Sequence, residues 1–96
     1  MNDMLTVIKA LAPNTAAVQV VNDICIGVTG YWPGRAGLHT IQFTRRPDGA
    51  WVVIVLDPDG IAAASRRLQP FRPCDVLRLT RFFADPLRWF LKGVKS

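Results

Sequence analysis

The sequence predicts a small α+β domain in which an antiparallel sheet is packed by a short N-terminal helix and by C-terminal helices. Two observations lead to this prediction. The apolar run AWVVIVL lies between two Pro-Asp-Gly turns at residues 47–49 and 58–60, and the pattern becomes helical from residue 61 onward. The chain has 96 residues, so we expect residues 1–96 to form a single domain.

The first third of the chain predicts one helix and one early strand. Apolar residues recur at helical spacing over residues 3–11, and Pro13 ends this pattern. Residues 16–28 fit either a helix or a strand, and their many valines and isoleucines favour a strand. Within that stretch, Asn22-Asp23 is a candidate tight turn or bulge.

The clearest prediction is a β-hairpin over residues 38–56. Residues 38–44 alternate, with Ile41 and Phe43 on one face. Proline, aspartate and glycine in sequence are typical of a tight turn, because proline presets φ, aspartate bonds back to the backbone and glycine accepts positive φ. Residues 50–56 are apolar on both faces, which favours a central strand.

The C-terminal segment predicts helices with a basic face. Residues 61–68 have helical spacing, two prolines then interrupt the pattern, and residues 75–95 form a basic amphipathic helical segment. Asp85 fits an N-cap, with Pro86 at the first helical position. One stripe of this segment contains Arg78, Arg81, Asp85, Arg88, Lys92 and Lys95. The opposite stripe contains Val76, Leu79, Phe83, Leu87, Phe90 and Val94.

Motifs for catalysis, nucleotides or metals are weak. The glycines of TGYWPGRAGLH, residues 29–39, lack the lysine and hydroxyl of a phosphate-binding loop and the spacing of a dinucleotide-binding fingerprint. Two distant cysteines and the single His39 do not make a zinc site. Cys25 and His39 are the one pair with nucleophile and base chemistry, and nothing in the sequence places them together. We therefore expect no enzyme, no cofactor and no metal.

The charge balance points to an anionic partner. Lysine and arginine number 12 against seven acidic residues, a formal net charge of +5, and nine of the 12 are arginine. Arginine suits carboxylates, phosphates and aromatic faces. The N-terminus does not resemble a signal peptide, because Asp3 precedes the apolar segment and no basic residue does, so we expect a cytoplasmic protein.

The function that the sequence favours is a non-enzymatic protein-binding module, a small adaptor or inhibitor that docks on a larger partner with an acidic surface. Stand-alone domains of this size are common among phage and mobile-element proteins. Arginine and large aromatic residues dominate interface hot spots, and they identify the candidate surface. Its predicted residues are Arg78, Arg81, Phe82, Arg88 and Trp89 in the tail and Tyr31, Trp32 and Arg35 in the loop.

Two other functions remain open from the sequence. The basic helical region, with aromatic residues available for stacking, suits a nucleic-acid-binding protein. The basic amphipathic tail suits peripheral association with a membrane surface, which we consider the less favoured partner. Phe82 and Trp89 lie nearer to the arginine stripe than to the apolar stripe, although the sheet or the N-terminal helix is an alternative cover for them.

Overall fold

Four antiparallel strands and two helices make up the fold in the computed structural model, which describes residues 2–32, 36–62, 69–86 and 88–89. In chain order the elements are α1 (Asn2–Leu11), β1 (Ala17–Asn22), β2 (Cys25–Gly30), β3 (His39–Arg45), β4 (Trp51–Leu56) and α2 (Val76–Ala84). The strands lie in the sheet order β1-β2-β3-β4, so each strand pairs with its neighbour in sequence. The predicted α+β class is confirmed.

The predicted hairpin over residues 38–56 is confirmed as β3 and β4. Phe43 lies opposite Val53 and Ile41 lies opposite Val55, and all four side chains are buried. The Pro-Asp-Gly turn closes the hairpin as expected: Gly49 has a φ of 87°, and Asp48 Oδ1 accepts a hydrogen bond from the backbone N–H of residue 50 at 2.9 Å.

The expected β structure over residues 16–28 is confirmed, but the chain reverses at the candidate turn Asn22-Asp23, so this stretch forms a second hairpin and not one strand. β1 and β2 are joined by a turn at Asn22–Cys25, where the Asn22 side-chain oxygen accepts a hydrogen bond from the Ile24 N–H at 2.9 Å. The ladder is regular from Ala17 to Val20, and a bulge then precedes the turn. Valine and isoleucine signalled strand correctly, whereas an Asn-Asp turn without glycine or proline signals a reversal only weakly.

The position of β4 also differs from the sequence prediction. The run AWVVIVL forms an end strand of the sheet and not a central one. Its outer edge is nevertheless covered at both ends by the chain that follows. Trp51 and Phe71 exchange two backbone hydrogen bonds of 2.7 and 2.8 Å, and Leu56 forms a bridge with Ala62. On its faces, β4 buries Trp51, Val53 and Val55 in the core and leaves Ile54 on the opposite face 44% exposed.

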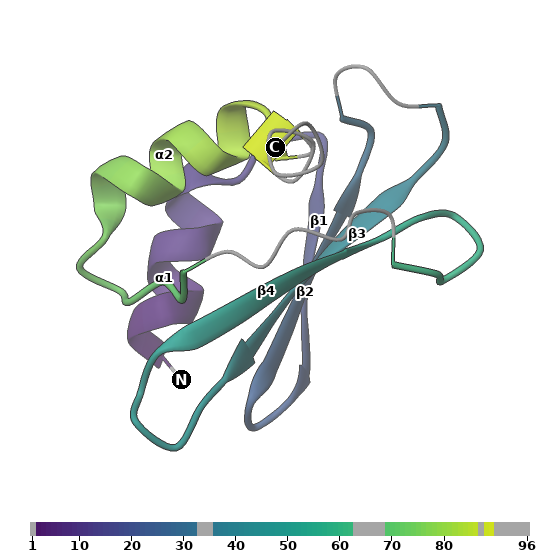
Figure 1. Ribbon diagram of the computed structural model, residues 1–96. Helices are drawn as coiled ribbons and strands as arrows, with labels where there is room; N and C mark the ends of the chain where they lie inside the picture. The colour runs from purple at the N-terminus through teal and green to yellow at the C-terminus, as the bar shows by residue number, and fades with distance from the viewer. Residues whose placement is uncertain (1, 33–35, 63–68, 87, 90–96) are drawn as a thin grey trace.

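Both helices pack on the same face of the sheet (Figure 1). The core between the two layers contains aliphatic residues from β2, β3 and β4, the inward side chains of α1 and α2, and a cluster of aromatic rings. Each large side chain that is fully buried contributes about 1.5–3 kcal/mol through the hydrophobic effect. The central members are Met4, Ile8, Ile26, Val28, Ile41, Phe43, Trp51, Val55, Phe71, Leu79 and Phe82.

The helices predicted after residue 61 are only partly described. Residues 63–68, which carry most of the first predicted helix, lie outside the described residues, as do residues 87 and 90–95 of the predicted segment 75–95. α2 forms the described start of that segment. In the described ranges, no helix combines the length and the apolar character that crossing a membrane requires.

Candidate interaction surfaces

α2 turns one side into the core and the other side outward. Leu79, Phe82 and Phe83 are buried, which accounts for the predicted apolar stripe at Leu79 and Phe83. Val76 does not follow that stripe, because it is 48% exposed. Leu77, the next residue, is 65% exposed. We define the α2 outer face as the exposed residues of this helix, which are Val76, Leu77, Thr80, Arg81 and Ala84.

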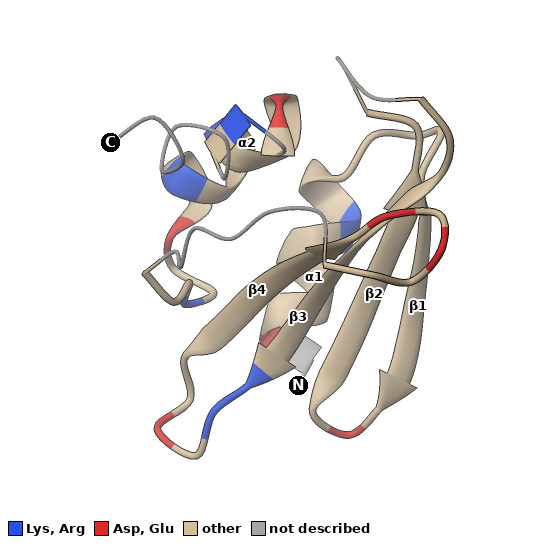
Figure 2. Cartoon of the chain, turned by 45° about the vertical axis from the view of Figure 1, so that its right-hand side comes forward, with Lys and Arg blue, Asp and Glu red and all other residues tan. Residues whose placement is uncertain are grey.

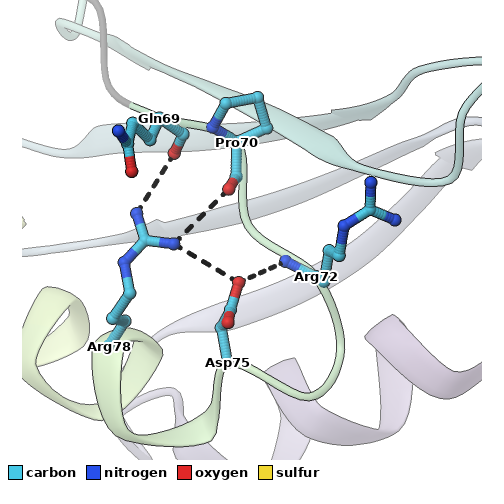
Figure 3. A network of polar contacts seen from close by, with 5 residues as sticks. All are labelled: Gln69, Pro70, Arg72, Asp75 and Arg78. Atoms are coloured by element: carbon cyan, nitrogen blue, oxygen red, sulfur yellow. Dashed lines mark hydrogen bonds and ion pairs between the residues drawn. The ribbon is translucent and has the colours of Figure 1, made fainter.

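Arg78 is fixed against the segment that precedes α2 (Figure 3). Its guanidinium donates hydrogen bonds to the carbonyl oxygens of Gln69 and Pro70 at 3.3 and 3.4 Å, and it pairs with Asp75 Oδ2 at 3.3 Å. Its Cζ atom also lies 4.4 Å from the centre of the Phe71 ring, a cation–π distance. Arg78 therefore ties α2 to residues 69–75, and its planar fork is largely occupied within the chain.

Arg81 and Arg88, the other two predicted arginines, are exposed. The Arg81 side chain makes no hydrogen bond or ion pair with any residue that the structure describes. The Arg88 backbone N–H donates to Asp85 Oδ1 at 3.4 Å, which agrees with the N-cap predicted at Asp85. Of the three arginines in the predicted stripe, Arg81 and Arg88 thus present their side chains outward, while Lys92 and Lys95 lie outside the described residues.

The two predicted tail aromatics belong to the interior more than to the surface. Phe82 is fully buried, and its ring centre lies 5.3 Å from that of Phe71. Trp89 is partly buried and packs against the same pair, 5.9 Å from Phe82 and 6.2 Å from Phe71. The sequence left open whether other elements cover these aromatic residues, and Phe82 is indeed covered. Phe82 therefore does not lie at the surface where a partner would contact it.

The loop between β2 and β3 is anchored by one of its aromatic residues and exposes the other. Trp32 is buried, and its indole N–H donates to the His39 carbonyl oxygen at 3.1 Å. His39 is also buried, and its Nδ1 lies 3.2 Å from the Gly37 carbonyl oxygen. Tyr31 is 69% exposed. Arg35 lies outside the described residues.

Gly37 shows why this loop needs glycine. Its φ is 84°, in the left-handed region that disfavours L side chains. A Cβ atom at this position would lie 2.8 Å from Cγ of Pro58. The loop therefore packs closely against the second Pro-Asp-Gly turn, and the described ends of TGYWPGRAGLH are held in place between β2 and β3.

The predicted residues fall on two separate surfaces. Figures 1 and 2 both place the β2–β3 loop and α2 on different sides of the molecule. Tyr31 remains exposed on the loop, and Arg81 and Arg88 remain exposed on the tail. Leu77 belongs to neither of the two predicted stripes, although it is exposed. Leu77 and Arg81 are four residues apart, and this spacing predicts that both lie on one helical face.

The structure does not assemble the one nucleophile and base pair that the sequence contains. Cys25 lies opposite Thr44 at one end of the β2–β3 ladder, and His39 lies opposite Gly30 at the other end. Five strand positions separate these ends, or roughly 16 Å at 3.3 Å per residue. Among the described residues, no group of three or more histidine, cysteine or acidic side chains is placed to hold a metal ion.

The aspartates after β4 serve the turn that follows that strand. Asp57 Oδ1 accepts hydrogen bonds from the backbone N–H groups of Asp59 and Ile61, each at 2.9 Å. This carboxylate is therefore engaged by its own turn.

Comparison of the chain with models of protein families, with curated proteins and with solved structures found no match.

Proposed function

We propose that this domain is a non-enzymatic binding module, a small adaptor or inhibitor, and that it docks on a larger protein through the α2 outer face. The exposure of Leu77 and Val76 beside the exposed guanidinium of Arg81, which pairs with no described residue, carries this proposal. Exposed leucines are common singly, but an apolar pair next to an arginine combines the two kinds of contact that protein interfaces use.

The charge of this face specifies the kind of partner. The α2 outer face contains one cation and no acidic residue, and the chain as a whole carries a formal net charge of +5. An apolar pocket with an acidic rim would complement it, because the pocket would receive Leu77 and the rim would pair with Arg81. Complementary charge would also accelerate association.

The support of α2 favours binding without reorganisation. Leu79, Phe82 and Phe83 pack the helix into the core, and Arg78 ties it to residues 69 and 70. A surface that is already ordered loses little conformational entropy when it binds. The α2 outer face would therefore be presented to the partner in one conformation.

The two alternatives receive less support. Peripheral membrane binding needs the apolar side of the amphipathic segment to be free, and in α2 this side is packed in the core. Nucleic-acid binding by stacking needs aromatic faces beside the arginines, and Phe82 is buried while Trp89 packs on Phe71 and Phe82. For these reasons we favour a protein partner.

The test is affinity capture from the native host, with and without nuclease, using the wild-type chain, Leu77→Ala, Arg81→Ala and Arg45→Ala. Arg45 is exposed at the end of β3, so Arg45→Ala is matched to Arg81→Ala in residue type and in charge lost. A protein that is retained after nuclease treatment is then purified, and its affinity for each variant is measured.

We expect Leu77→Ala and Arg81→Ala each to weaken binding about tenfold, which corresponds to about 1.4 kcal/mol, while Arg45→Ala binds like the wild type. Equal affinities for all four chains would contradict the assignment to α2. Capture that nuclease abolishes and that weakens steeply with salt would favour the nucleic-acid alternative instead.

A further inference from the structure

β1 is a sheet edge that no described residue covers. It pairs with β2 on one side, and the two isolated bridges found outside the strands both involve β4. Figure 2 shows β1 at the outer edge of the sheet, with no charged residue along it and an acidic residue at the β1–β2 turn. The free side of such a strand offers backbone N–H and C=O groups to another strand.

The sequence of β1 lacks the usual protection of an edge. Proteins block exposed edges with charged residues, proline, short strands or bulges. Residues 10–22 contain no charged side chain, although a fifth of the chain is charged, and β1 contains no proline. The one bulge comes after Val20, so the strand stays regular over Ala17–Val20. Val20 and Val21 are both exposed, at 46% and 54%.

We propose that β1 pairs with β1 of a second copy of this chain, in an antiparallel two-fold arrangement that continues the sheet across both chains. A register centred on Gln19 places this residue opposite its own counterpart and Val18 opposite Val20. Residues that face each other in this register lie on the same side of the sheet, as cross-strand pairing requires.

Charge favours a second copy as the occupant. Two chains that each carry a net charge of +5 repel each other wherever their arginines meet, whereas the β1 edge brings only valine, glutamine and alanine together. No like charges face each other across the junction. At the uncharged β1 edge, two equally charged copies can therefore meet without repulsion between facing side chains.

The covered edge of β4 limits the assembly to two chains. Bridges to Phe71 and Ala62 occupy both ends of that edge, so in the described sheet β1 is the edge that offers an uninterrupted strand for pairing. A two-fold contact between identical edges is closed, because each copy uses the same surface once. The expected product is a dimer that does not grow into a fibre.

The experiment measures the molecular mass in solution by sedimentation over a wide range of protein concentrations, for the wild type, Val20→Lys and Ile54→Lys. Ile54 is the matched control because it is 44% exposed, against 46% for Val20, but lies on β4, at the opposite end of the sheet from β1. We expect dimers for the wild type and Ile54→Lys. Val20→Lys should weaken dimerisation about tenfold or more, because two like charges then enter the junction.

A second variant and a second measurement distinguish loss of the dimer from misfolding of the Val20→Lys chain. Gln19→Lys places a lysine opposite its counterpart and should also yield monomers. In the wild-type chain, hydrogen exchange of the β1 amides should slow as the protein concentration rises. A wild type that stays monomeric, a Val20→Lys chain that remains dimeric, or dimers lost only in Ile54→Lys would each overturn the proposal.

Discussion

Replacing Arg78 by alanine removes four interactions that join α2 to the chain before it. Two are hydrogen bonds to the carbonyl oxygens of Gln69 and Pro70, one is the ion pair with Asp75, and one is the contact with the Phe71 ring. Arg81→Ala is the matched control. Arg81 lies three residues further along the same helix, and none of the described residues forms a hydrogen bond or ion pair with its guanidinium.

The magnitude follows from the geometry at Arg78. The hydrogen bonds of 3.3 and 3.4 Å are long, so each contributes about 0.5 kcal/mol. The side chain is 36% exposed, and solvent screening limits the ion pair to a few tenths of a kcal/mol. The cation–π contact adds about 0.5–1 kcal/mol. We expect Arg78→Ala to lower the free energy of unfolding by about 2 kcal/mol.

The assay is urea unfolding of both variants, followed by circular dichroism. Both changes replace arginine by alanine within one helix, so the difference in helix propensity cancels. Arg81→Ala should stay within about 0.5 kcal/mol of the wild type, whereas Arg78→Ala should also lower the Tm by roughly 10 °C. Equal stability of the two variants would refute the assignment of Arg78 to the support of α2.

Three further predictions concern the loop and the tail. Trp32→Phe should cost about 1–2 kcal/mol in urea unfolding, because the buried carbonyl of His39 loses its donor; a neutral change would argue against that hydrogen bond. Gly37→Ala should lower the Tm more than Gly60→Ala, since both have positive φ but only Gly37 has a ring against its Cβ position. Trp89→Ala should cost roughly 2–3 kcal/mol by calorimetry through lost aromatic packing, and an unchanged Tm would place Trp89 at the surface instead.

The strands could be predicted where the turn residues between them have strong conformational preferences. Proline, aspartate and glycine together specify a reversal, and the hairpin between β3 and β4 formed where the sequence placed it. The turn between β1 and β2 relies on the Asn22 side chain, which is a weaker signal because asparagine occurs in many contexts. One strand was therefore expected where the chain folds back on itself.

The candidate surface was harder to predict than the fold. The stripes of the tail were extrapolated through Asp85 and Pro86, but α2 ends at Ala84, so angles beyond that point no longer apply. An inward helical face also spans at least about 100°, which is wide enough to include both Phe82 and Phe83. Whether an arginine is free depends on distant partners, as the contacts of Arg78 with Gln69 and Pro70 show.

The docking of a partner on α2 is tested most directly by nuclear magnetic resonance. The isotope-labelled domain is titrated with the protein captured from the host, and changes in the backbone amide signals are mapped onto the structure. We expect the largest shifts or line broadening at Leu77 and Arg81 and their neighbours on the α2 outer face. Changes centred instead on Tyr31 and Leu38, with α2 unaffected, would contradict the account and assign binding to the β2–β3 loop.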